Sequence, residues 1–190
     1  MSARLARRGN APGARLIAFL RAINVGGHTV TMERLRRLFE RMGFRGVETF
    51  IASGNVVFEA DGADRAALER SIAAGLEAAL GWEVATFVRT PSELSAIAAH
   101  EAFPAAALAG ARAHVVGLLA EPLGRAAAAQ LMALRTAEDD FRVHGREFYW
   151  LSRVGQGKSE FSNAVFEQVT GARATLRGMN TMRRMAARFA

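Results

Sequence analysis

One segment near the N-terminus constrains the fold more than any other part of the chain. Its apolar residues form strand-like runs and a stripe at helical spacing, and two polar corners that contain glycine interrupt them. The expected elements are a strand, a helix and two paired strands, over residues 16–25, 31–42, 47–52 and 56–58. Thr31 can cap the helix, and Ser53-Gly54-Asn55 forms the short corner between the paired strands. This order predicts the first part of a small α+β unit.

Two further elements complete this unit. Asp64 can cap a second helix, and residues 83–89 predict a fourth strand. The resulting order, β-α-β-β-α-β, is the ferredoxin-like arrangement. Thr90-Pro91-Ser92-Glu93 follows with the pattern of a capping box and a proline at the first helical position, which predicts a short connecting helix.

The same order of elements recurs in the second part of the chain. Strands are expected over residues 113–120, 141–143, 147–151 and 174–177, with helices over 122–134, 161–169 and 180–189. We therefore predict an α+β protein, a tandem duplication of ferredoxin-like units with two antiparallel sheets and an extra C-terminal helix. The predicted parts are a disordered basic tail, a first half, a linker and a second half with the terminal helix, over residues 1–15, 16–100, 101–111 and 112–190.

The composition excludes several classes of function. The chain has 190 residues, 51% of them hydrophobic, so it can bury a core, and it has no cysteine for a disulfide, a thiolate metal site or a cysteine nucleophile. Its four histidines lack the spacing of metal ligands, so no metal or cofactor is predicted and no catalytic residue is assigned. No apolar run approaches the roughly 20 residues of a membrane span, and no signal peptide is recognisable, which predicts a cytoplasmic protein.

The positive charge is concentrated at the two ends of the chain. The net charge is +7, and residues 1–15 and 173–190 contain arginines and no acidic residue. Basic ends of this kind can bind nucleic acid. The alternative is that the N-terminal arginines form a solubilising tail and the C-terminal arginines form the solvated face of a helix.

Several motifs resemble those of one bacterial family. They are Arg21-Ala22-Ile23-Asn24-Val25-Gly26-Gly27, Ser53-Gly54-Asn55-Val56-Val57-Phe58, Gly157-Lys158-Ser159, Asn163 and the segment 174–181. They are similar to the family catalogued as domain of unknown function 1697, over residues 15–185. Met179 stands where an aromatic residue is usual, and the basic N-terminal extension is additional. The resemblance implies a tandem ferredoxin-like fold and no particular activity.

The two glycine-containing corners are the first candidates for a binding site. In a ferredoxin-like unit, right-handed crossovers bring the end of the first strand and the hairpin between the second and third strands to the same edge of the sheet. Backbone N–H groups at a glycine-rich turn beside a helix N-terminus suit an anion. The candidate residues for a small anionic or phosphorylated ligand are Arg21, Asn24, Gly26, Gly27, Ser53, Gly54 and Asn55. The alternative is structural: the glycines permit tight turns, Asn satisfies backbone groups, and Arg21 pairs with a buried acid.

A second group of residues could also hold an anion. These are Lys158, Ser159, Arg177 and Asn180. The segment around Lys158 resembles a phosphate-binding loop but has Ser152 where that loop requires a glycine, so we expect Ser159 to cap a helix instead. Three functions remain open from the sequence: binding of, or catalysis on, a small anion, binding of RNA through the basic ends, and binding of a protein partner without catalysis.

Overall fold

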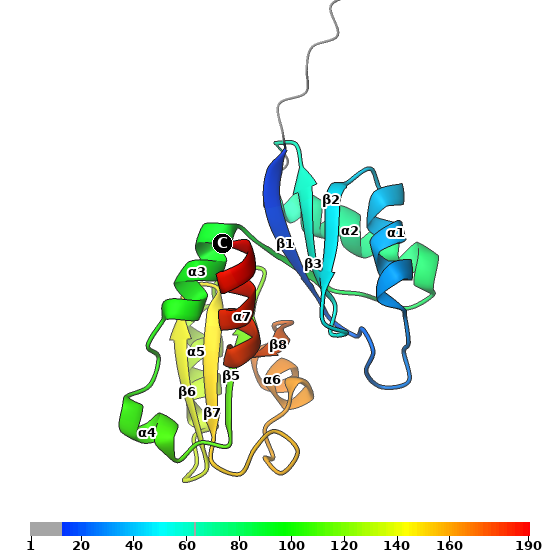
Figure 1. Cartoon of the computed structure of the whole chain (residues 1–190). Helices are drawn as coiled ribbons and strands as arrows, with labels where there is room; N and C mark the ends of the chain where they lie inside the picture. The colour runs from blue at the N-terminus through cyan, green and yellow to red at the C-terminus, as the bar shows by residue number, and fades with distance from the viewer. Residues whose placement is uncertain (1–12, 63) are drawn as a thin grey trace, which may run out of the picture.

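The computed structural model describes residues 13–62 and 64–190, so residues 1–12 of the predicted tail lie outside the described part. Two four-stranded antiparallel sheets and seven helices make up the described residues, which confirms the α+β class (Figure 1). The first half contains β1 (Ala14–Leu20), α1 (Met32–Arg41), β2 (Arg45–Phe50), β3 (Asn55–Ala60), α2 (Arg65–Leu80), β4 (Thr86–Arg89) and α3 (Pro91–Ala99). The short helix α4 (Ala105–Ala109) follows, and the second half contains β5 (Ala113–Leu118), α5 (Arg125–Ala133), β6 (Asp139–His144), β7 (Glu147–Ser152), α6 (Asn163–Thr170), β8 (Thr175–Gly178) and α7 (Met179–Phe189).

The two sheets have the same order of strands. The first is β2-β3-β1-β4 and the second is β6-β7-β5-β8, with every pairing antiparallel. In each sheet the first strand of its half therefore lies in the centre, between the third and the fourth. β1 and β5 are both buried at their C-terminal ends. The first candidate corner begins just after the end of β1.

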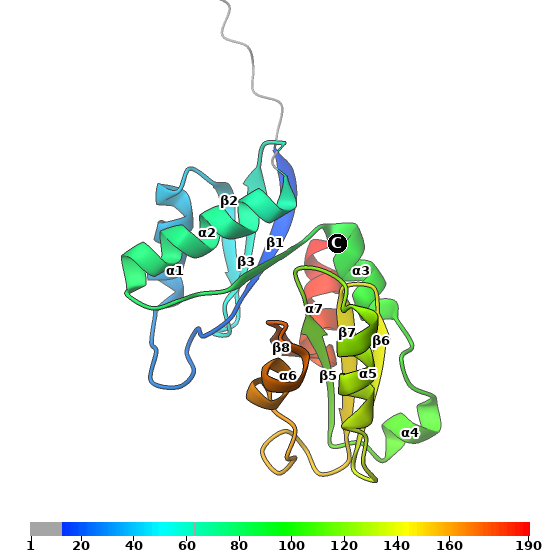
Figure 2. The ribbon, with the colours of Figure 1, turned by 180° about the vertical axis from the view of Figure 1, so that it is seen from behind.

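Three apolar clusters hold the layers together. One joins the first sheet to α1 and α2, and another joins the second sheet to α5 and α6. The third includes side chains from both sheets together with α3 and α7, for example Phe19, Ile97, Val116 and Met182. Figures 1 and 2 show α3 and α7 side by side between the halves. Because the halves share this cluster, burying it stabilises both of them together.

The predicted caps account for where several helices begin. Thr31 Oγ1 accepts from the Arg34 amide, and Asp64 Oδ2 accepts from the Ala67 amide. Thr90 forms the expected capping box with Glu93 at the start of α3. The prediction for Ser159 is wrong: α6 begins four residues later, and Ser162 accepts the capping hydrogen bond from the Val165 amide.

The first strand also ends earlier than predicted. β1 stops at Leu20, whose amide donates to Gly54 O at 2.8 Å, and Ala22 and Asn24 then adopt positive φ angles. These left-handed residues turn the chain out of the sheet, so the strand expected over residues 16–25 ends before Arg21. Ile23 consequently packs with α1 and α2 rather than beside Phe19 in the cluster between the sheets.

The described helices also bear on the membrane prediction. None of the helices in residues 13–62 and 64–190 combines the length and the apolar character that crossing a membrane requires.

Candidate binding edge

Two loops lie side by side at the end of β1, and we call them the loop edge: residues 21–30 and residues 51–55. Asn24 connects them, because its Nδ2 donates to Ala52 O at 3.0 Å while its Oδ1 accepts from the Val30 amide at 2.9 Å. This places Asn24 beside the second corner, as predicted. Its side chain joins the two loops and closes the base of the first one.

The first loop is also held from the side by Trp82, which follows α2. The Trp82 indole N–H donates to Ala22 O at 3.2 Å, and the His28 ring stacks on the indole with 4.5 Å between centroids. The loop is thus fixed at both ends and in the middle. Sequence reasoning did not identify Trp82 or His28 as anchors, because their contacts cross a large separation in sequence.

The backbone of the loop edge is strained. Among the described residues, the only non-glycine residues with positive φ are Ala22, Asn24 and Ile51, at 60°, 57° and 49°. A β-branched residue such as Ile51 is an outlier in this region, and strain of this kind costs about 1–3 kcal/mol per residue. Strained residues cluster at sites where a particular backbone shape serves binding or catalysis.

The same two loops carry the exposed large apolar side chains of the described chain. Val25 is 58% exposed and Ile51 is 42% exposed. Neither residue stands out in the sequence, since Val25 lies within an apolar run and Ile51 continues a strand pattern. The signal is visible only once the strands are known to end before them.

Gly26 and Gly27 form the exposed tip of the first loop. Their φ angles are +59° and +86°, a conformation that favours glycine, and a Cβ added at either position would meet no atom within 4 Å. Neither amide donates a hydrogen bond to any residue that the structure describes. The tip therefore presents two backbone donors on an anchored base.

The second corner is packed more tightly. Asn55 is fully buried, and its Nδ2 donates to Phe50 O at 3.1 Å and to Ser53 Oγ at 2.9 Å. Gly54 has a φ of +71°, and a Cβ there would lie 2.9 Å from Ile23 Cβ, so the corner requires glycine. Ser53, Gly54 and Asn55 thus hold the two loops together from within.

Arg177, a residue of the second predicted group, reaches this corner from β8. Its Nε donates to Asn55 Oδ1 at 2.6 Å, and its Nη2 donates to Leu20 O at 2.8 Å and to Ser53 O at 2.7 Å. Within the described chain, its guanidinium forms no ion pair and is surrounded by neutral oxygen atoms. Burial lowers the pKa of Arg177 to about 10. A positive charge without a compensating acid therefore lies directly behind the loop edge.

A matching contact occurs at the corresponding corner of the second half. Arg89 of β4 donates through Nε to Glu147 Oε1 at 2.8 Å and through Nη2 to Leu119 O at 2.8 Å. Asn55 and Glu147 both begin a hairpin strand, and each arginine projects from the last strand of the opposite half. The difference is electrostatic, because Glu147 neutralises Arg89 whereas the amide of Asn55 leaves Arg177 charged.

Arg21 does not contribute a free charge to the loop edge. Its Nη1 lies 2.7 Å from Glu167 Oε1 of α6, and the two side chains are 33% and 25% exposed. The predicted pairing with an acid is therefore present, although the pair is open to solvent rather than sealed.

The other predicted anion residues, Lys158, Ser159 and Asn180, make their contacts outside the loop edge. Ser159 Oγ donates to Asp139 Oδ2 at 2.8 Å and accepts from the Phe161 amide, which is a structural arrangement. Lys158 lines a cavity of 790 Å³ together with Glu160. Asn180 is exposed at the start of α7, and its Oδ1 is 3.4 Å from a donor nitrogen of Arg183.

The basic C-terminal helix is partly engaged within the molecule. Arg188 donates to Glu48 of β2 at 3.1 Å, and the Arg184 guanidinium lies over the Phe50 ring at 5.4 Å. These contacts fix α7 against the first half. In the described residues, no group of three or more acidic or histidine side chains is arranged to hold a metal ion.

Comparisons with known proteins give a family and a fold. A search of curated proteins finds no match. Among solved structures, the chain is similar to the conserved bacterial protein SP0830 from Streptococcus pneumoniae, with a TM-score of 0.68 and 18% sequence identity. The similarity covers 93% of this chain and 98% of that one, and at this identity it concerns the fold alone. Residues 14–149 match a family profile, and the chain therefore belongs to the family described as "Protein of unknown function (DUF1697)".

Proposed function

We propose that the protein binds a small anionic or phosphorylated ligand at the loop edge. The observation that carries the proposal is the uncompensated charge of Arg177 behind an anchored loop whose tip exposes two backbone amides. A buried charge is screened by salt much less than an exposed one. Exposed N–H groups on a rigid glycine turn bind an anion without an ordering cost at the moment of binding.

The asymmetry between the halves supports this assignment. In the second half Glu147 cancels the charge of Arg89, whereas in the first half Asn55 accepts a similar hydrogen bond from Arg177 without a charge. A corner built only for stability has no need to leave a buried charge uncompensated, because pairing it lowers the cost of burial. The strain at Ala22, Asn24 and Ile51 falls on the loop edge, to which Asn55 belongs.

We further propose that the halves are two copies of a ferredoxin-like unit, over residues 16–100 and 112–190, joined by residues 101–111. The pairing of strands supports this, because corresponding residues pair in the same way in both halves. In the first half Asn55 lies opposite Phe19, and Arg89 lies opposite the residue two positions before Phe19. In the second half Glu147 lies opposite Leu118, and Arg177 lies opposite the residue two positions before Leu118. Each half therefore contributes an arginine to the corresponding corner of the other half, so the two contacts are related by an approximate twofold symmetry.

A charge substitution at the exposed tip tests the ligand proposal. The Val25→Asp variant places a carboxylate beside Gly26, and because Val25 is 58% exposed the fold should be unaffected. Asparagine has nearly the same shape as aspartate but carries no charge, so Val25→Asn serves as the control. Thermal-shift measurements over phosphorylated metabolites and nucleotides should identify a ligand that stabilises the natural protein and Val25→Asn, but not Val25→Asp. Equal stabilisation of both variants, or no stabilising anion in the screen, would refute the proposal.

A further inference from the structure

A separate cavity lies where the end of α3, the following segment, α4, β5 and α7 meet. Its volume is 460 Å³, within the usual size of small-molecule sites. Part of its wall is apolar, including Phe103, Pro104 and Leu108, and part is polar. The loop edge takes no part in it, so the cavity is independent of the site proposed above.

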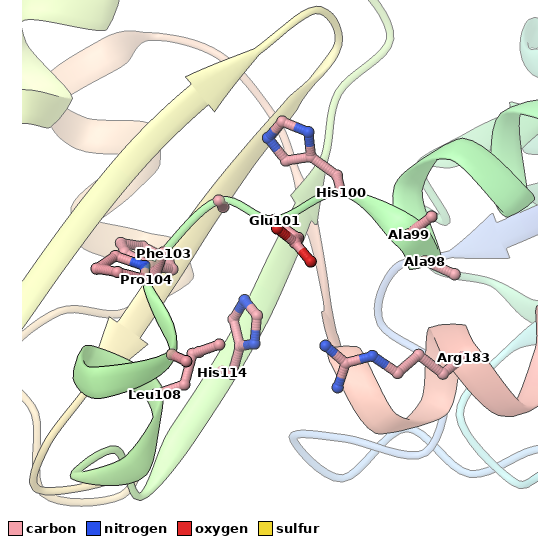
Figure 3. Close-up of a pocket in the computed structure, with 11 residues that line it drawn as sticks. Ala98, Ala99, His100, Glu101, Phe103, Pro104, Leu108, His114 and Arg183 are labelled. Carbon is pink, nitrogen blue, oxygen red and sulfur yellow. The ribbon is translucent and has the colours of Figure 1, made fainter.

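Two opposite charges line this cavity. Figure 3 shows the Glu101 carboxylate and the Arg183 guanidinium directed toward the same space from different segments. Neither side chain forms an ion pair with any described residue, and the contact of Arg183 with Asn180 Oδ1 is long, at 3.4 Å. The two charges thus face one cavity without meeting each other.

His114 adds an unused polar atom to the same wall. Its Nε2 is buried and has no hydrogen-bond partner among the described residues. The ring is held edge-on to Phe103, with 5.7 Å between centroids. Burial lowers the pKa of His114, and the charge of Arg183 lowers it further, so the ring is neutral near pH 7. A buried nitrogen without a partner is unusual in proteins, and because it is covered, it lies behind the surface of the cavity rather than on it.

The wall beside His114 is rigid. The His100 ring stacks on His144 with 4.4 Å between centroids and lies 4.7 Å from the Tyr149 ring. Tyr149 is almost fully buried in the cluster between the sheets. The segment that carries Glu101 is therefore held at its start by contacts of the His100 ring.

We propose that this cavity binds a small zwitterion, a free α-amino acid with an apolar side chain. Its carboxylate would pair with Arg183, its ammonium group with Glu101, and its side chain would contact Phe103 and Leu108. Two opposite charges that are kept apart on one wall are best satisfied by a molecule that carries both. The neutral His114 ring lines the cavity without adding a third charge.

Calorimetric titration with L-phenylalanine and L-leucine tests this inference on the full chain. At least one should bind saturably, and N-acetyl-L-phenylalanine and L-phenylalaninamide, which each lack one charge, should bind about 10-fold more weakly or worse. Arg183→Gln and Glu101→Gln should each weaken binding by about the same factor. Both residues are exposed, so neither substitution should unfold the chain.

A neighbouring residue provides the matched control. Arg184 follows Arg183 on α7 but lies over Phe50, away from the cavity, so Arg184→Gln should leave the affinity unchanged. Val25→Asp should also leave it unchanged, which separates this site from the loop edge. The inference is overturned if neither amino acid binds, if a derivative lacking one charge binds equally well, or if Arg184→Gln weakens binding as much as Arg183→Gln.

Discussion

Replacing Glu147 by glutamine tests how strongly the buried ion pair between the halves stabilises the protein. Arg89 is fully buried, and its Nε donates to Glu147 Oε1 at 2.8 Å, with the Glu147 side chain 11% exposed. Glutamine has nearly the same shape and can still accept this hydrogen bond. The substitution therefore removes the negative charge and changes little else.

The expected loss follows from the electrostatics of a buried pair. Two unit charges about 4 Å apart attract by about 4 kcal/mol at an effective dielectric constant of about 20. Removing one partner of such a pair costs about 3–5 kcal/mol, because the other charge stays buried. Burial already lowers the pKa of Arg89, and Glu147 is the main charge that opposes this lowering. We expect the free energy of unfolding to fall by about 3 kcal/mol. This is the lower end of that range, because the glutamine amide can still accept the hydrogen bond from Arg89.

Urea denaturation monitored by tryptophan fluorescence measures this loss, since Trp82 and Trp150 report on different halves. The matched control is Glu121→Gln, whose carboxylate pairs with Arg65 at the surface and should contribute about 0–1 kcal/mol. A loss for Glu147→Gln no larger than that of the control would refute the claim that the pair stabilises the junction. Separate transitions for the two fluorophores would show that the halves unfold independently.

Three other substitutions or conditions give defined outcomes. Gly54→Ala should lower the free energy of unfolding by at least about 1–3 kcal/mol, because its Cβ would lie 2.9 Å from Ile23 Cβ at a φ of +71°, and urea midpoints check this. Ile51→Gly should raise the melting temperature, because it releases the strain of an isoleucine at a φ of 49°, and an unchanged or lower value contradicts the strain argument. The pKa of His114 is lowered in the folded state, so the unfolded chain binds its proton more readily and stability should fall as the pH decreases below about 6.5, the ordinary value. His114→Phe should reduce that pH dependence, as measured by melting temperatures between pH 5 and pH 8. An unaltered pH dependence would show that His114 is not its source.

Local patterns in the sequence predicted the elements and several of their caps. Thr31, Asp64 and Thr90 each carry a side chain that can accept from an amide three residues later, and this relation needs no knowledge of the rest of the fold. The end of β1 was not predictable in the same way, because the apolar run continues after the backbone turns away at Ala22. A left-handed non-glycine residue has no reliable sequence signal.

The candidate site was predicted in part for the same reason. Topology alone predicts that Asn24 and the corner Ser53-Gly54-Asn55 lie at one edge, and Asn24 contacts Ala52, the residue before that corner. The role of Arg177 could not be predicted, because its contact with Asn55 spans 122 residues and depends on how the halves pack. The sequence allows pairing of Arg21 with an acid, but only the structure identifies Glu167 as the partner.

A two-dimensional ¹H–¹⁵N NMR titration with inorganic pyrophosphate tests the proposed anion site most directly. The backbone amides of Gly26 and Gly27 should shift progressively and reach saturation, because they are the exposed donors at the loop edge. Gly145, which has a φ of +57° in the corresponding hairpin corner of the second half, is the internal control and should not shift. Saturable shifts confined to the loop edge are the predicted result. Unshifted Gly26 and Gly27 amides, or equal shifts at Gly145, would contradict the account.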